Sequence, residues 1–118
     1  MLKFICKTQF LIQLTTYLAK SRNSQVVYLA GKVTGEPADE CQTKFKTAQR
    51  KLEAQGFTVL NPCDFISPDE NWQIAMRLAT TMLNMADHIY LLPDWKDSQG
   101  ATYEHQQALK FGLNTIYE

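Results

Sequence analysis

The part of the chain richest in groups that can do chemistry runs from Asp94 to Glu104. It leads into a segment with helical periodicity, so its polar groups stand at a predicted helix N-terminus. Backbone N–H groups there lack intrahelical partners and the helix dipole is positive, which favours a phosphate or carboxylate ligand. Ser98 adds a hydroxyl donor, and Gly100 allows a ligand close to the backbone. The alternative is that Ser98 caps the helix and Gly100 serves the turn.

Glu104 lies in the first turn of this predicted helix. A carboxylate in that position can attack an anomeric carbon or stabilise an oxocarbenium-like transition state. The alternative is a surface glutamate that interacts with the helix dipole, which is worth about 0.3–1 kcal/mol. Position alone favours the surface glutamate.

Further candidates stand at the ends of predicted strands, and they are Gly31, Lys32, Asn61, Asp94 and Trp95. Lys32 can meet an anion or be solvated, and Trp95 can stack on a base or pack in a core or interface. Tyr28, near the end of the first strand, faces either the core or the ligand crevice.

Four apolar runs rich in β-forming residues predict strands, at residues 26–30, 57–60, 88–92 and 114–117. Helical segments separate them. One carries Cys41, Phe45, Ala48 and Leu52 on a single face and ends at Gly56, and the last covers residues 100–111. Such alternation predicts an α/β three-layer sandwich with a parallel sheet of four to five strands. Ligands of such sheets bind beyond the carboxyl ends of the strands.

The middle helix has an unusually complete predicted start. Ser67 serves as N-cap, Pro68 stands in the first turn, and Glu70 completes a capping box. The residues predicted to face inward from this helix are Trp72, Ala75, Met76, Ala79, Leu83 and Ala86.

Residues 1–24 form an extension ahead of the domain at residues 25–118. Its apolar residues Phe10, Leu11, Leu14, Tyr17 and Leu18 fall at helical spacing, which predicts an amphipathic helix from about Thr8 to Lys20. That helix packs either on the domain or on a second subunit.

Composition narrows the function classes. The 118 residues make about one domain, and 12 basic residues balance 12 acidic ones, which argues against a groove binder of nucleic acid. Zero net charge favours a homo-oligomer. The cysteines Cys6, Cys41 and Cys63 form no C-x-x-C pair, so we expect reduced thiols in the cytoplasm and no metal or other cofactor. No apolar run is long enough for a membrane helix, and neither a dinucleotide nor a P-loop motif occurs.

Three short motifs follow one another along the chain: Tyr28-Leu29-Ala30-Gly31, then Ala86-Asp87, then Ser98-x-Gly100-x-x-Tyr103-Glu104. In this order and spacing they resemble the nucleoside 2-deoxyribosyltransferase superfamily, in particular its small bacterial and phage branch. The spacing of the last motif is also similar to that of the 2′-deoxynucleoside 5′-monophosphate N-glycosidases. The resemblance implies a flavodoxin-like or Rossmann-like sheet and often a dimer.

The same resemblance implies roles for individual residues. Glu104 matches the carboxylate nucleophile that takes the deoxyribosyl group at C1′, and Tyr28 matches a tyrosine that lines the sugar pocket and orients that carboxylate. Ser98 and Gly100 match positions near the sugar 5′ end, where the glycosidases hold a phosphate.

Three positions depart from the family pattern. Ser98 replaces an Asp of the transferases, which favours a phosphorylated ligand, and Gln106 replaces a Gly. Ala79 stands where the family carries an acid that helps the base to leave, and proton transfer of this kind contributes about 10²–10⁴-fold. Asp69 and Glu70 are expected to lie too far back along the helix to substitute.

Three hypotheses follow. The first is an N-glycosidase or deoxyribosyltransferase-like enzyme that acts on a nucleoside or a deoxynucleoside 5′-monophosphate through Glu104. The second, motivated by Ala79, is a catalytically weak domain that binds a nucleotide-like ligand as a sensor. The third is an interaction module whose functional surface is the N-terminal helix.

Overall fold

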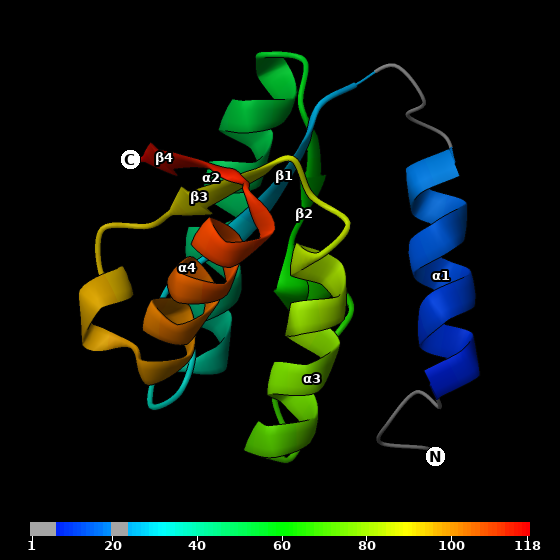
Figure 1. Cartoon of the computed structure of the whole chain (residues 1–118). Helices are drawn as coiled ribbons and strands as arrows, with labels where there is room; N and C mark the ends of the chain where they lie inside the picture. The colour runs from blue at the N-terminus through cyan, green and yellow to red at the C-terminus, as the bar shows by residue number, and fades with distance from the viewer. Residues whose placement is uncertain (1–6, 20–23) are drawn as a thin grey trace.

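The computed structural model describes residues 7–19 and 24–118. After the N-terminal helix α1 (Lys7–Ala19), strands and helices alternate as the sequence predicts (Figure 1). The strands are β1 (Val26–Ala30), β2 (Thr58–Leu60), β3 (His88–Leu91) and β4 (Asn114–Tyr117). The elements between them are α2 (Ala38–Ala54), α3 (Trp72–Leu83) and α4 (Gln99–Phe111), and two short 3-10 helices, η1 (Pro62–Asp64) and η2 (Trp95–Asp97).

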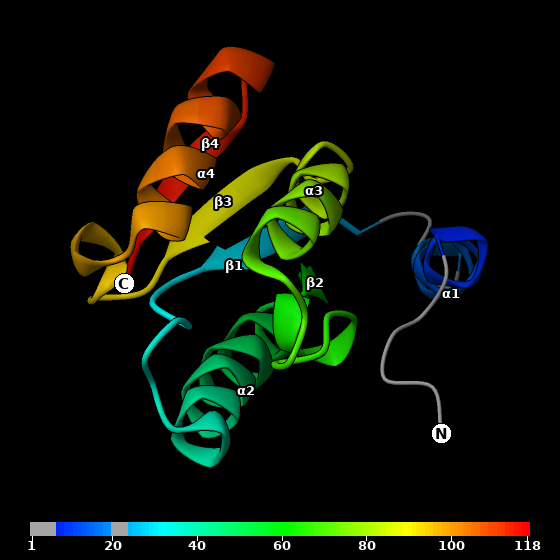
Figure 2. The same cartoon turned by 90° about the horizontal axis from the view of Figure 1, so that it is seen from below.

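The strands of the described residues form one sheet in the order β2-β1-β3-β4, and every neighbouring pair is parallel. α2 covers one face of this sheet, and α3 and α4 cover the other (Figure 2). The predicted α/β class with a parallel sheet is therefore confirmed, in a flavodoxin-like arrangement. β2 and β4 are the edge strands.

Side chains of β1 alternate between the two faces of the sheet. Val27 and Leu29 belong to the core that contains α2, whereas Tyr28 and Ala30 belong to the core that contains α3 and α4. A strand covered on both faces reads as a continuous apolar run, which is the pattern of residues 26–30. The alternation places Tyr28 on the α4 face, close to the carboxyl end of the strand.

The strands follow β1 toward one edge of the sheet, at β2, and then toward the other edge, at β3 and β4. These strands are neighbours, but the chain leaves β1 for α2 on one face and leaves β3 for α4 on the other. Connections that diverge in this way leave a crevice at the carboxyl ends of the two strands. The fold therefore provides a ligand site at the predicted edge.

The predicted start of the middle helix is wrong. α3 begins at Trp72, and Asn71 is its N-cap, because the Asn71 side chain accepts hydrogen bonds from two backbone N–H groups at the start of the helix. Ser67 instead closes a turn in which its hydroxyl accepts from Asp69 N and its carbonyl from Glu70 N. Trp72, predicted to face inward, is 43% exposed because it occupies the first position of the later helix.

The N-terminal helix packs on the domain. Phe10 and Leu14 are fully buried in the core on the α3 side, and Tyr17 donates a hydrogen bond of 2.7 Å to the carbonyl of Val59 in β2. α1 thus lies at the β2 edge of the sheet (Figure 1). Its predicted last residue, Lys20, and Cys6 lie outside the described residues. No helix in the described part of the chain is long and apolar enough to cross a membrane.

Candidate functional site

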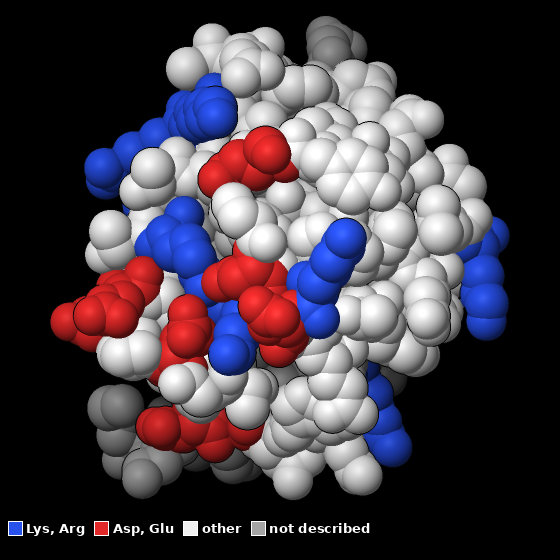
Figure 3. Space-filling model, turned by 90° about the vertical axis from the view of Figure 1, so that its left-hand side faces the viewer, with Lys and Arg blue, Asp and Glu red and all other residues white. Residues whose placement is uncertain are grey.

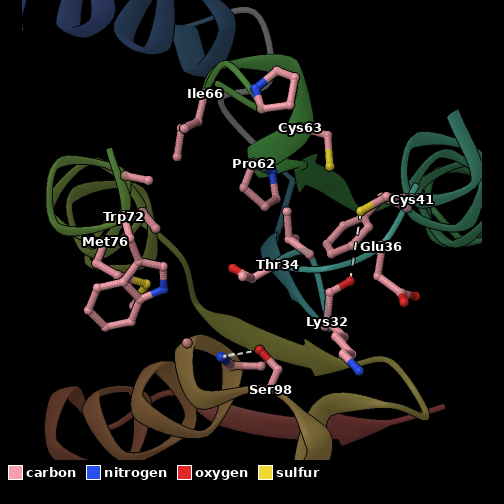
Figure 4. Close-up of a pocket in the computed structure, with 18 of the residues that line it drawn as sticks. Lys32, Thr34, Glu36, Cys41, Pro62, Cys63, Ile66, Trp72, Met76 and Ser98 are labelled. Carbon is pink, nitrogen blue, oxygen red and sulfur yellow. Dashed lines mark hydrogen bonds between the residues drawn. The ribbon is translucent and has the colours of Figure 1, made fainter. Parts of the chain in front are cut away.

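A cavity of about 680 Å³ opens at the carboxyl ends of the strands. This volume is within the range of about 300–1,000 Å³ that small-molecule sites have. Its walls come from the loop after β1, from α2, from the segment after β2, from α3 and from the start of α4 (Figure 4). The cavity therefore collects residues from the whole length of the domain.

Tyr28 and Glu104 meet in this cavity. The Tyr28 hydroxyl donates a hydrogen bond of 2.6 Å to Oε2 of Glu104, and both side chains are buried. Glu104 faces inward because it shares one side of α4 with Ala101 and Ala108, at spacings of three and four residues. Glu104 is thus a buried cavity residue, and the alternative of a surface glutamate is wrong.

The environment of Glu104 changes its acidity. Burial raises the pKa of Glu104 to about 7, although the hydrogen bond from Tyr28 acts in the opposite direction. Burial, and then the neighbouring Glu104 carboxylate, raise the pKa of Tyr28 well above its ordinary value, so the phenol remains a donor. No other described residue donates a hydrogen bond to the Glu104 carboxylate. A carboxyl group that titrates near neutral pH in a cavity is typical of functional sites.

The N-terminus of α4 forms one wall of the cavity. Ser98 is the N-cap, since its Oγ accepts a hydrogen bond of 3.0 Å from Ala101 N. Among the described residues, the N–H groups of Gln99 and Gly100 have no acceptor, and both residues line the cavity. These N–H groups and the Ser98 hydroxyl hydrogen can therefore bind an anion or a hydroxyl group.

Asn61 and Trp95 do not line this cavity. Asn61 is buried, and its side chain accepts from Cys63 N and donates to Gln49 Oε1, so it connects the end of β2 to α2. The Trp95 ring contacts the rings of His105 and Tyr117 instead of an open crevice. The structure gives both side chains packing contacts within the fold.

Asp94 also lies outside the cavity lining, but it fixes the loop that forms one wall. One carboxylate oxygen accepts from Lys32 N at 3.0 Å and the other from Lys44 Nζ at 2.6 Å. Lys44 also binds Glu36 and the carbonyl of Lys32. Burial acts to raise the pKa of Asp94, but these hydrogen bonds outweigh it and keep the pKa below its ordinary value.

The surface charge of the face shown in Figure 3 is mixed. Acidic and basic side chains are interspersed on it, without a continuous basic patch.

Gly31 lines the cavity, yet tight packing also explains a glycine there. A Cβ at this position would lie 2.6 Å from Cδ1 and 3.0 Å from Cβ of Leu92. We expect Gly31→Ala to lower the free energy of unfolding by about 1–3 kcal/mol, because overpacking forces Leu92 to move. Urea unfolding measures the change. Gly100→Ala is the comparison, with a smaller loss expected, since the tightest contact of its Cβ would be with the flexible Met76 side chain, at 3.2 Å, and its contact with Ser98 Oγ, at 3.8 Å, is an ordinary one.

The cavity also contains two cysteines that the sequence pattern did not bring together. Cys41 on α2 and Cys63 in η1 are 22 positions apart, and they line the same cavity (Figure 4). Burial raises the pKa of Cys63 to about 12 and raises that of Cys41 as well, so both remain thiols. Within residues 7–19 and 24–118, no group of three or more His, Cys, Asp or Glu side chains could hold a metal ion.

Other cavity residues were not among the candidate binding residues that the sequence indicated. Thr34 stands in the loop after β1, and Trp72 and Met76 point into the cavity from α3 (Figure 4). Glu70 lines the cavity as well, whereas Asp69 does not. Glu70 does not lie on α3, because residues 67–71 come before that helix and contain a turn.

Comparison with known families assigns the chain to one of them. A model described as a domain of unknown function (DUF4406) matches residues 25–117. The chain belongs to the DUF4406 family. The DUF4406 domain includes Tyr28, Glu104 and the rest of the described cavity, and α1 lies before its first matched residue. Among curated proteins, none is similar enough to this chain to count as a match.

Proposed function

We propose that this protein cleaves or exchanges the bond between base and sugar in a nucleoside or a deoxynucleoside 5′-monophosphate. The observation that carries the proposal is the buried Tyr28–Glu104 pair, with its 2.6 Å hydrogen bond, in a cavity at the carboxyl ends of the strands. A carboxylate held by one phenol and otherwise without a donor has an oxygen available for attack on an anomeric carbon.

The reaction uses Glu104 as its nucleophile. A carboxylate oxygen of Glu104 attacks C1′ of the sugar while the bond from C1′ to the base nitrogen breaks and its electron pair leaves with the base, which takes up a proton. Water, or an N–H nitrogen of a second base, then attacks C1′ and passes its proton to the group that protonated the first base, while the bond from C1′ to the Glu104 oxygen breaks and releases the carboxylate. Tyr28 keeps the carboxylate oriented through both steps. Ser98 and the free N–H groups of α4 hold the 5′ end of the sugar.

The proton for the departing base needs a donor other than Ala79, which lines the cavity with a methyl group. Glu70 lines the same cavity from the turn before α3, and its Oε1 accepts a hydrogen bond from Asn71 N. A half-buried carboxyl group on that wall can protonate a leaving base directly or through one water molecule. We assign this role to Glu70.

The test is base release from a panel of nucleosides and deoxynucleoside 5′-monophosphates, followed by chromatography with Glu104→Gln alongside. Release that disappears in the variant supports the enzyme. If no base is released but the same ligands still raise the melting temperature, the protein is instead a nucleotide-binding sensor, the alternative that Ala79 favours. Absence of both effects contradicts both functions.

Removal of the Glu70 carboxyl group tests whether Glu70 supplies the proton that Ala79 cannot supply. We expect Glu70→Gln to lower kcat by about 10²-fold, the lower end of the usual contribution of general acid catalysis. Asp69→Asn is the matched control, because it removes a neighbouring carboxylate outside the cavity and is expected to leave kcat unchanged. Equal rates for Glu70→Gln and the unmodified protein would remove Glu70 from the mechanism.

A further inference from the structure

We infer that α1 is a positioning element for one wall of the cavity. The wall consists of residues 62–68, and five of its residues line the cavity: Pro62, Cys63, Ile66, Ser67 and Pro68. Ile66 points from this segment into the cavity (Figure 4). The inference goes beyond the proposed function, because it concerns what holds the wall and applies to any ligand of the cavity.

The connection between α1 and the wall is an aromatic cluster. Phe65, in the middle of the wall, meets the rings of Phe10 and Tyr17 edge to face, with centroid distances of 6.4 and 5.9 Å. Such pairs are worth about 0.5–1.5 kcal/mol each beyond the burial of their area. Phe65 therefore lies between two side chains of α1, while the next residue, Ile66, faces the ligand space.

A hydrogen bond anchors α1 at the same place. The Tyr17 hydroxyl donates to the carbonyl of Val59 at 2.7 Å, one strand position before β2 ends and three positions before the wall begins. Phe10 is 1% exposed and Leu14 is completely buried, so this helix is part of the core. α1 thus holds both the end of β2 and the segment that follows it.

The two ends of the wall have different supports. Its beginning is tied to α2 by the salt bridge from Lys46 to Asp64 and, one residue before the wall, by the hydrogen bond from Asn61 to Gln49. Its later part is held by backbone hydrogen bonds from Phe65 N and Ile66 N to the carbonyl of Pro62, by the turn closed by Ser67, and by the contacts with α1 and the adjacent core. The Pro62 bonds couple Phe65 to the residues around Cys63. Loss of the α1 contacts is therefore expected to open the wall locally while the sheet stays folded.

The thiol of Cys63 reports on this wall without any ligand. Cleavage after lysine and arginine places the three cysteines on different peptides, so their alkylation rates are measured separately in one protein. We propose timed alkylation of the folded full chain with N-ethylmaleimide, followed by digestion and mass spectrometry. Cys41, held in α2 next to Cys63, is the internal reference for opening of the whole domain.

We expect Tyr17→Ala to raise the alkylation rate of Cys63 about tenfold relative to that of Cys41. Tyr17→Phe keeps the ring and loses the hydrogen bond, so an increase of about threefold is expected. Ile12→Ala, which removes a side chain of α1 that is 59% exposed, is the matched control and is expected to change neither rate. If Tyr17→Ala does not fold, Phe10→Leu takes its place, and we expect it to raise the alkylation rate of Cys63 by about threefold to tenfold.

Two outcomes overturn the inference. Equal acceleration of Cys63 and Cys41 would mean that α1 only stabilises the whole domain. An unchanged rate at Cys63, with or without a lower melting temperature, would mean that the wall holds its position without α1. Since neither rate depends on a substrate, these results are independent of whether base release is found.

Discussion

Replacement of Glu104 by Gln is expected to abolish base release and to stabilise the protein above neutral pH. The amide cannot act as a nucleophile, but its oxygen can still accept the hydrogen bond from Tyr28. At the same time the variant loses a buried negative charge, because the wild-type carboxyl group has a pKa of about 7 and is mostly ionised at pH 8. Activity and stability therefore change in opposite directions.

The pH dependence of this effect has a definite sign. Burial raises the pKa of Glu104 from 4.5 to about 7, so below pH 4.5 the group is protonated in both the folded and the unfolded chain. Between these values the folded protein binds more protons than the unfolded chain, and stability falls as the pH rises. Above pH 7 the full cost of the buried charge, about 3 kcal/mol, is present.

Urea unfolding at pH 5 and pH 8 measures this cost. We expect the stability of Glu104→Gln relative to wild type to increase by about 2–3 kcal/mol between the two pH values, since the other titrating groups cancel in the comparison. Glu40→Gln, which removes a carboxylate at an exposed position of α2, is the control for the loss of a surface charge. A constant difference for Glu104→Gln would contradict a buried, shifted carboxyl group.

Tyr28→Phe is expected to have the second largest effect. The hydroxyl donates to the Glu104 carboxylate at 2.6 Å and thereby favours its charged form. Hydrogen bonds to charged groups contribute about 1.5–3 kcal/mol, so their loss raises the pKa of Glu104 by about one unit or more. The acid limb of the pH profile of kcat/KM should therefore move to higher pH, and the rate at pH 7 should fall at least about fivefold.

The shape of the profile separates orientation from acidity. If Tyr28 only tunes the pKa of Glu104, the rate of Tyr28→Phe recovers at pH 9. If it also orients the carboxylate, a lower plateau remains there. A profile identical to that of the wild type would show that the hydrogen bond has no role in the reaction. The double variant with Glu104→Gln should lose no more activity than Glu104→Gln alone, because the two residues act as a unit.

The sequence predicted the sheet and the location of the cavity because both depend on local patterns. Residues 26–30 form an uninterrupted apolar run, and the alternation of such runs with helical segments leaves few topologies. The inward position of Glu104 was not predictable in the same way. It depends on the rotation of α4 against the sheet, which brings Ala101 and Ala108 onto the same side.

Other parts of the site depend on competition between similar local signals. Ser67 and Asn71 are both favoured N-caps, and tertiary packing selects Asn71, which frees Glu70 to line the cavity. The approach of Cys41 and Cys63, and the salt bridge from Lys44 to Asp94, join segments distant in sequence. Such pairs follow from the three-dimensional arrangement and leave no periodicity in the sequence.

The position of α1 also restricts how copies of this chain can associate through their sheets. The Tyr17 hydroxyl donates a hydrogen bond to the carbonyl of Val59, so an outward hydrogen-bonding group of β2 already has a partner. Among the described strands, β4 pairs only with β3. Among the described residues, β4 is therefore the edge more open to an incoming strand. Two copies paired through β4 about a twofold axis would use up both open edges, which makes a closed dimer the natural limit and works against fibre growth.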